Sequence, residues 1–201
     1  MAYIGNKPAN KAIVASDLDP AVITGQTALA VAPADTDEFL ISDAGTLKRI
    51  DYSLITNTPA FEAYRSANQA ISDNTATKVQ FDTEAFDTGT VYDNSSNYRF
   101  TPGVAGKYLC YSTIRGGNDG SATLNLLAIK FYKNGSAYQT GTTQLIHFIT
   151  NPGANASVTI TQLIDLDDDD YVEVFATIDT TTGSPDVGQN SVFGAFKITG
   201  V

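Results

Sequence analysis

The chain has 201 residues, 42% of them hydrophobic, and its 22 acidic and 12 basic side chains leave a formal net charge of −10. This length suits one large all-β domain, or one ordinary domain with an appendage. A chain this acidic should not follow a nucleic-acid backbone, and an anionic membrane would repel it, so we expect neither as a partner.

The features of secreted and membrane proteins are missing from the sequence. No apolar run is long enough to cross a bilayer, and the N-terminus lacks the apolar stretch of a signal peptide. Cys110 is the single cysteine, which excludes an intrachain disulfide, and its apolar neighbours predict a buried small side chain. We expect a protein that is made in the cytoplasm and stays soluble, or leaves the cell by a route other than ordinary secretion.

Residues 1–58 are weakly patterned and contain too few large apolar residues for a core of their own. Within them, residues 39–42 and 46–50 predict two strands joined by a three-residue hairpin loop, with Gly45 at positive φ. The stretch ITNTPA at 55–60 is the predicted hinge, because its proline restricts the preceding residue. We predict that residues 1–58 are an attachment segment that becomes ordered against other proteins or within an oligomer.

From residue 59 to the end, short runs rich in Thr, Val, Ile, Tyr and Phe are separated by Gly, Asn, Asp and Pro. The Asn134-Gly135 pair predicts a tight hairpin between the runs on either side of it. Strand-like runs that recur about every ten residues indicate an all-β, antiparallel two-sheet sandwich. The clearest predicted strands are residues 106–115, 124–135, 155–166, 171–179 and 191–200.

The run 171–179 has an informative alternation. One face carries Val172, Val174, Ala176 and Ile178, and the other carries Tyr171, Glu173, Phe175 and Thr177. The second face is not polar enough to be simply solvated. We therefore predict a subunit contact there, at Phe175 and Tyr171.

Four blocks of the C-terminal segment resemble one family. They are the aromatic–acid stretch FDTEAFDTGTVYD (81–93), the passage YRFTPGVAGKYLCYSTIR (98–115), the turn and strand LDDDDYVEVFAT (166–177), and the closing strand SVFGAFKI (191–198). Residues 61–201 thereby resemble the TNF-like jelly roll, the fold of the globular head of the first complement component. The resemblance implies a homotrimer whose outer surfaces and apex bind ligands.

The N-terminal phrases MAYIGNKP (1–8) and ADTDEFLISDAGTLKRIDYSLI (34–55) resemble the leading segments of tailed-bacteriophage structural proteins. This resemblance implies a non-enzymatic protein on the exterior of the virion, made in the host cytoplasm and attached to other virion proteins through residues 1–58. The leading interpretation is a short tail fibre whose head recognises a host-surface glycan. A capsid decoration protein or head fibre is nearly as well supported. A polysaccharide-degrading tailspike is disfavoured by the short chain without β-helix repeats, and a cellular adhesin by the missing signal peptide.

The acid-rich stretch 81–93 raises the question of a catalytic carboxylate cluster. We interpret it as structural, because nothing in the spacing specifies a cleft. Its aromatic residues (Phe81, Phe86 and Tyr92) are predicted to pack the sandwich, and its aspartates (Asp82, Asp87 and Asp93) to end strands and accept hydrogen bonds from turn amides. His147, the only histidine, has apolar neighbours and no nucleophile motif accompanies it, so we predict no catalytic residue.

Two kinds of binding site stay open as hypotheses. The consecutive carboxylates of Asp167, Asp168, Asp169 and Asp170 could hold calcium, although no EF-hand spacing is present and such a run is more often solvated. With no tryptophan in the chain, a sugar would have to stack on tyrosine, for which Tyr132 and Tyr138 are the candidates. Asn118 and Asp119 lie in a polar stretch, 115–121, that is predicted to be a ligand-adaptable loop.

Overall fold

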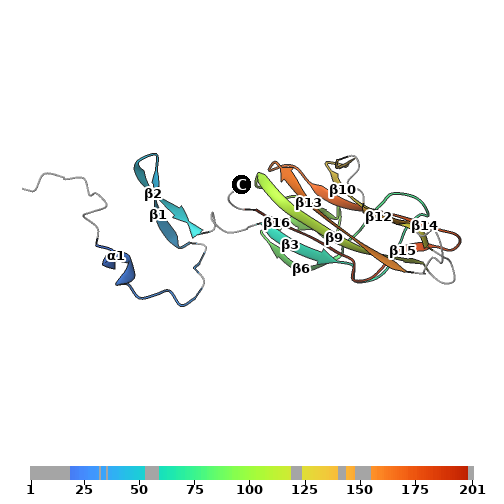
Figure 1. Cartoon of the computed structure of the whole chain (residues 1–201), viewed down its shortest axis with the longest axis horizontal. Coiled ribbons are helices and arrows are strands. Elements are labelled where there is room, and N and C mark those ends of the chain that lie inside the picture. The colour runs from blue at the N-terminus through green and yellow to red at the C-terminus, as the bar shows by residue number, and fades with distance from the viewer. Residues whose placement is uncertain are drawn as a thin grey trace, which may run out of the picture. The chain divides into compact units, whose positions relative to one another are not determined.

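The computed structural model describes residues 19–31, 33–34, 36–52, 59–118, 124–139, 144–147 and 155–198. The chain divides into two compact units, Met1–Leu54 and Ile55–Val201 (Figure 1). Most of the predicted hinge, residues 55–58, lies outside the described residues. No helix in the described part of the chain is long and apolar enough to span a membrane.

The first unit contains the predicted hairpin. A single helical turn, α1 (Ala21–Thr24), precedes the antiparallel strands β1 (Glu38–Asp43) and β2 (Thr46–Asp51). The prediction of a three-residue loop is wrong, because the turn has two residues, Ala44 (φ 47°) and Gly45 (φ 83°). Positive φ at both central residues gives a turn whose twist matches that of the two strands. The apolar side chains of this hairpin are largely exposed, with Leu40 at 76% and Leu47 at 71%.

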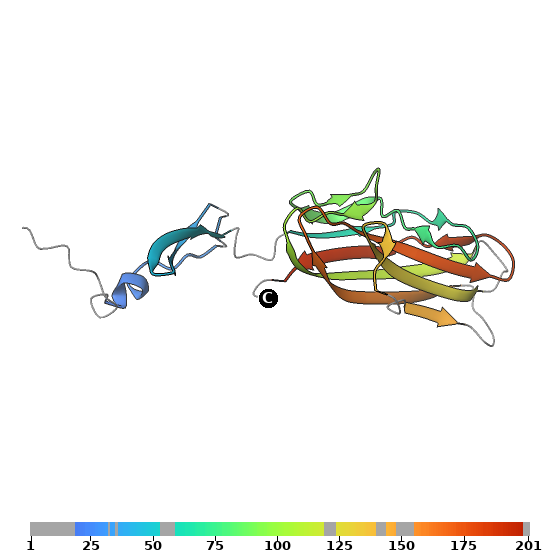
Figure 2. The same ribbon diagram turned by 90° about the horizontal axis from the view of Figure 1, so that it is seen from above.

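The second unit is a sandwich of two antiparallel sheets, which confirms the predicted fold class (Figure 2). The first, which we call the β10 sheet, has the order β11-β10-β14-β8-β7, with β12 paired to β10 and β5 to β14. Its strands are β5 (Thr77–Lys78), β7 (Tyr92–Asp93), β8 (Arg99–Phe100), β10 (Leu124–Lys133), β11 (Ser136–Ala137), β12 (Gln144–His147) and β14 (Val172–Thr180).

The second sheet, the β9 sheet, has the order β4-β15-β9-β16-β3-β6, with β13 paired to β9. Its strands are β3 (Ala60–Tyr64), β4 (Gln69–Ala70), β6 (Thr83–Thr88), β9 (Gly106–Asn118), β13 (Ala156–Leu166), β15 (Pro185–Val187) and β16 (Val192–Lys197). Strands from both ends of the unit meet here, because the closing strand β16 lies between β9 and β3.

The prediction of a loop over residues 115–121 is wrong for its first part, because strand β9 continues to Asn118. Gly116 and Gly117 look like loop residues, yet both pair with β15. A Cβ atom on Gly116 would lie 2.7 Å from Leu127 Cδ1, so glycine here allows close packing between the sheets. Residues 119–123, including Asp119, lie outside the described residues.

Aromatic rings fill the centre of the sandwich. Phe193 packs edge-on against Phe61, with centroids 4.9 Å apart, and also contacts Phe81, Tyr92 and Phe131. The prediction that Phe81 and Tyr92 are core residues is confirmed.

Burial elsewhere also follows the sequence pattern, with one exception. Cys110 is buried, as predicted, and its burial raises the pKa of the thiol. The alternation in β14 is confirmed as well, since Val172, Val174, Ala176 and Ile178 all belong to the core. The prediction for Phe86 is wrong, because this side chain is 49% exposed on the outer face of the edge strand β6.

Candidate functional site

The aspartates of the acid-rich stretch bind backbone amides, as predicted. Asp87 accepts hydrogen bonds from the amides of Val91 (3.0 Å) and Tyr92 (2.9 Å) and so shapes the connection between β6 and β7. Asp93 accepts from the amides of the turn that follows it, and these bonds lower the pKa of its carboxyl group. The donors to Asp93 are the amides of Ser95 (3.0 Å), Ser96 (2.8 Å) and Asn97 (3.1 Å).

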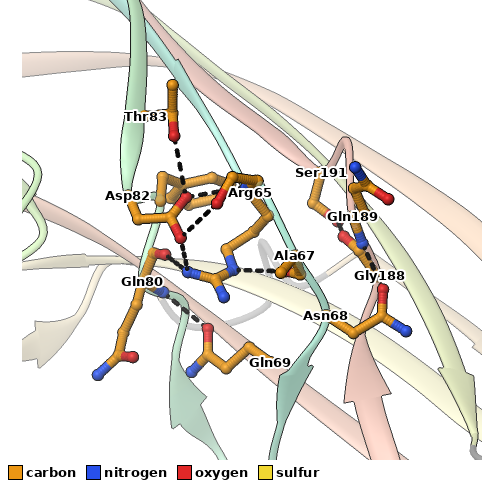
Figure 3. Close-up of polar contacts among 12 residues, drawn as sticks. Arg65, Ala67, Asn68, Gln69, Gln80, Asp82, Thr83, Gly188, Gln189 and Ser191 are labelled. Atoms are coloured by element: carbon orange, nitrogen blue, oxygen red, sulfur yellow. Dashed lines mark hydrogen bonds and ion pairs between the residues drawn. The ribbon is translucent and has the colours of Figure 1, made fainter.

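Asp82, the first aspartate of the stretch, joins a partly buried cluster around Arg65 (Figure 3). The Arg65 guanidinium donates to Asp82 (3.0 Å), to the carbonyl of Ala67 (3.2 Å) and to the carbonyl of Gln80. Ser66 donates to the same carboxylate through its amide (2.8 Å) and its hydroxyl (2.9 Å). Partial burial raises the pKa of Asp82, but the Ser66 hydrogen bonds and the charge of Arg65 outweigh it and lower the pKa. The cluster ties the end of β3 to the segment before β6.

The structure does not bring the four carboxylates of residues 167–170 together. Asp170 is 7% exposed and turns inward, where it accepts from Asn134 Nδ2 (2.6 Å) and the Asp167 amide (2.7 Å) and pairs with Lys133 Nζ (2.6 Å). The Lys133 ammonium, followed by the Asp167 amide, lowers the pKa of Asp170 to about 2. The other three aspartates are exposed. Among the described residues, no three His, Cys, Asp or Glu side chains form a group that could hold a metal ion.

Three of the aromatic candidates, Phe175, Tyr132 and Tyr171, lie on the outer face of the β10 sheet. Phe175 and Tyr132 stack on each other, with ring centroids 3.9 Å apart and planes at 25°, beside a small cavity of about 110 Å³. Tyr171 is half-buried, and the Arg99 guanidinium lies 4.4 Å from its ring centroid. The predicted subunit contact at Phe175 and Tyr171 and the predicted sugar contact at Tyr132 therefore lie on one sheet face.

The remaining candidates lie apart from this aromatic pair. Tyr138 packs against the hydrophobic core, and its amide donates to the carbonyl of Phe131 (2.9 Å). Asn118 ends strand β9 opposite Pro185, and its side chain lies outside the described residues. The same holds for the side chain of His147, whose backbone belongs to β12.

An apolar outer face on the β9 sheet is the main feature that sequence reasoning missed. Leu163 lies opposite Leu109, which lies opposite Phe196, so an apolar row crosses three neighbouring strands. Leu163 is 57% exposed. The alternation in the strand 106–115 could have revealed this outer face, because Leu109 and Tyr111 lie on the face opposite the buried Tyr108 and Cys110. We call this surface the β9 outer face, defined by Tyr64, Phe86, Leu109, Tyr111, Leu163, Val192 and Phe196.

Within the described strands, Glu62 carries the only carboxylate at the centre of this face, and that carboxylate accepts a hydrogen bond from a tyrosine. The Tyr111 hydroxyl donates to Glu62 Oε2 at 2.6 Å, and burial, together with this bond, raises the pKa of Tyr111. To reach Glu62 on β3, the Tyr111 side chain crosses over Gly194 of the intervening strand β16, where a Cβ atom would collide with the ring. The middle of the face is therefore largely apolar, while the charged side chains of Lys107, Arg115 and Asp165 lie on the same face toward the ends of β9 and β13.

Comparisons with known proteins were informative only at the level of structure. No family model matches the chain, and no curated protein matches its sequence significantly. The structure is similar to the globular domain of zebrafish complement 1qA protein, with a TM-score of 0.51 and 15% identity over 70% of this chain and 98% of that one. It is similar to murine APRIL with a TM-score of 0.51 and 12% identity, again over 70% of this chain and 98% of the other. At these identities the likeness is one of fold, and the second unit adopts the TNF-like and C1q-like jelly roll that the sequence blocks resembled.

Proposed function

We propose that the chain is a non-enzymatic structural protein of a tailed-bacteriophage virion, in which three copies associate through their jelly-roll units. The observation that carries the self-association is the β9 outer face, where Leu163 (57% exposed) and Phe86 (49% exposed) border an apolar sheet surface. Large exposed apolar patches mark interaction surfaces. The jelly-roll fold and the resemblance to trimeric family members support a trimer over other oligomers.

Charge supports the choice of this face over the rest of the surface. Each copy carries a formal charge of −10, so identical copies repel one another wherever their carboxylates meet. On the β9 outer face the one central carboxylate, Glu62, already accepts a hydrogen bond from Tyr111. A closed cyclic trimer would bury three copies of this face around one axis.

Phe175, the residue predicted from sequence for the subunit contact, has a different role in this proposal. Its ring is already stacked on Tyr132 within the same chain. Self-association through the β9 outer face leaves this stack exposed on the far sheet of the sandwich.

The test is the mass of the purified full-length protein by light scattering at micromolar concentration. We expect a trimer for the parent chain, a monomer or a strongly weakened trimer for Leu163→Arg, and a trimer for Phe175→Ser. Both positions are partly or fully exposed, so circular dichroism should show both variants folded. A monomeric parent chain contradicts the proposal. If Phe175→Ser dissociates the trimer and Leu163→Arg does not, the subunit interface lies on the β10 sheet instead.

The virion role is proposed from the N-terminal phrases and follows the leading interpretation, a short fibre on the particle exterior that recognises the host surface. Antibody labelling of intact particles in electron micrographs tests the location. Purified trimers that adsorb to host cells and compete with phage would support the fibre. Labelling of the shell, with loss of capsid stability in particles that lack the protein, would instead identify a decoration protein.

A further inference from the structure

A cleft of about 580 Å³ opens along one side of the sandwich. Its walls come from β6, which ends the β9 sheet, from β7, which ends the β10 sheet, from the neighbouring strand β8, which carries Arg99, and from the connections between these strands. Clefts that bind small molecules commonly have volumes of about 300–1,000 Å³. The residues with chemical interest in its lining are Glu84, Thr90, Asp93, Asn97, Arg99 and Thr101.

Arg99 is a positioned cation with unused donors. Its guanidinium lies over the Tyr171 ring, 4.4 Å from the centroid, a contact that restricts the side chain without using its N–H groups. Within the described part of the chain, the Arg99 side chain makes no hydrogen bond or ion pair. Asp93 lies opposite it across the β7–β8 pair, but that carboxylate is occupied by the amides of its own turn. The donors of Arg99 are therefore available to a ligand in the cleft.

The walls of the cleft are held in place before any ligand arrives. Asp87 bonds the amides of Val91 and Tyr92 on one side, and Asp93 bonds the turn at 95–97 on the other. Thr90, a β-branched residue in the lining, has φ of 57°, a left-handed conformation that such residues rarely adopt. Strained backbone of this kind gathers at ligand sites, where the surrounding structure maintains it.

The chemistry of the lining suits a neutral polyhydroxyl ligand. Arg99 offers donors, and Glu84, exposed and without a hydrogen bond or ion pair among the described residues, offers an acceptor. The hydroxyls of Thr90 and Thr101 can do both. Sugar hydroxyls donate and accept as well, so they match such a mixed set. An anionic ligand would meet Glu84 and a chain of net charge −10, which disfavours it.

We propose that this cleft is a binding site for a neutral saccharide, with Arg99 as the principal donor and Glu84 as an acceptor. The proposal deepens the proposed role in host-surface recognition and rests on it only for the source of the saccharide. The lining of the cleft shares no residue with the β9 outer face, although strand β6 contributes Glu84 to the cleft and Phe86 to that face.

Saturation-transfer difference NMR on the full-length protein tests the site, with maltotriose, mannotriose and methyl β-galactoside as neutral probes at about 10 mM and glucuronic acid as the charged comparison. We expect a transfer signal from at least one neutral probe. Arg99→Ala should weaken its affinity about tenfold or more, because a hydrogen bond to a charged group is lost. Arg99→Lys keeps the charge but not the planar fork and should also weaken binding. Glu84→Gln should weaken it less.

The matched control is Arg49→Ala, which removes the same side chain from the exposed hairpin of the other unit and should leave the affinity unchanged. Thermal melting and light scattering check that each variant keeps its fold and mass. The proposal is overturned by no signal from any of the three neutral probes, by equal affinity of Arg99→Ala and the parent chain, or by a preference for glucuronic acid.

The two proposals can fail separately. If trimers adsorb to host cells and Arg99→Ala adsorbs equally well, the saccharide site fails while host recognition stands. If the neutral probe binds in an Arg99-dependent way but trimers do not adsorb, the site stands and the host-recognition role fails.

Discussion

The aspartates of the acid-rich stretch each bind a separate part of the backbone. Asp82, Asp87 and Asp93 follow one another closely in sequence, yet each accepts hydrogen bonds from a different set of amides. A buried or half-buried amide without a partner costs free energy, so each aspartate stabilises the backbone that it binds. Asp87 and Asp93 cap the turns next to them, whereas Asp82 binds the distant Ser66 amide and the Arg65 guanidinium.

The Arg65 cluster should be the most sensitive of these to a single substitution. In Arg65→Met, the Asp82 carboxylate keeps its Ser66 donors but loses its ion pair, and two carbonyls lose their donor, so we expect the free energy of unfolding to fall by about 2–3 kcal/mol. Urea denaturation followed by circular dichroism measures it. Arg49→Met is the control, since the Arg49 side chain is 76% exposed in its pair with Glu38 and should contribute less than about 0.5 kcal/mol. Equal effects of the two substitutions would contradict a structural role for the cluster.

Asp170 should make stability depend on acid pH. Its pKa is lowered to about 2 by Lys133 and by the Asp167 amide, so its contribution to stability is complete above its ordinary pKa of 3.8 and is lost as the pH falls toward 2. Asp170→Asn removes this contribution at every pH and should destabilise the protein by about 1–3 kcal/mol near neutrality. We expect the free energies of unfolding of the parent chain and of Asp170→Asn to converge as the pH falls from about 4 to about 2. A difference that stays constant over that range would exclude the titration of Asp170 as the cause.

At the scale of elements, the strands β9 and β16 determine what the outer surface of their sheet looks like. Their inward residues, including Cys110 and Phe193, are buried, while the outward residues at the middle of the pair, Leu109, Tyr111, Val192 and Phe196, are also apolar or aromatic. Gly194 permits this, because the Tyr111 ring lies across it to reach Glu62. One small residue therefore allows an aromatic side chain to lie flat on the sheet.

Gly194→Ala should disturb this arrangement. The new Cβ would collide with the Tyr111 ring and lie 2.9 Å from the carbonyl of Phe61, so we expect a loss of about 1–3 kcal/mol in the free energy of unfolding and a weaker trimer. Adding Tyr111→Ala relieves the clash with the ring but not the one with the backbone. A double-mutant cycle by urea denaturation should therefore give a favourable coupling between the two substitutions. Strict additivity would show that Tyr111 does not lie over Gly194.

At the scale of the whole molecule, the two units differ in how much apolar surface each buries by itself. The second unit encloses an aromatic core between two sheets, whereas the hairpin of the first leaves Leu40 and Leu47 exposed. A two-stranded hairpin alone is at best marginally stable in water. The first unit therefore fits a segment that gains its stability from a partner surface.

A shortened chain of residues 55–201 should fold by itself. We expect its melting temperature to stay within a few degrees of that of the full chain and its mass by light scattering to remain that of a trimer, because the core and the β9 outer face both lie in this unit. Incorporation into particles should be lost. Normal incorporation of the shortened chain would place the attachment site outside residues 1–54.

Much of the fold was predictable, because the alternation within a strand and the residues of a tight turn are visible in a few neighbouring residues. Alternation in β14 and the Asn134-Gly135 turn have the same meaning in any context, and the structure agrees with both. The glycines at 116 and 117 misled the prediction, because glycine marks a loop in sequence whether it serves flexibility or close packing. The prediction for Phe86 failed for a different reason. An aromatic residue in a strand-like run predicts burial, but Phe86 lies on an edge strand whose outer face is not covered by any element in the described part of the chain.

Local patterns were enough to predict the all-β class, the hairpin strands, the turns capped by Asp87 and Asp93 and the burial of Cys110, because these patterns involve residues close together in the chain. Which apolar residues share an outer face, and which polar residues share a cleft, depends instead on how distant strands pair. Leu109, Leu163 and Phe196 form a row only because β13, β9 and β16 pair in one register. Glu84 and Arg99 line one cleft only because the edges of two different sheets lie along the same side of the sandwich. Both surfaces depend on long-range strand pairing, which no local pattern of residues specifies.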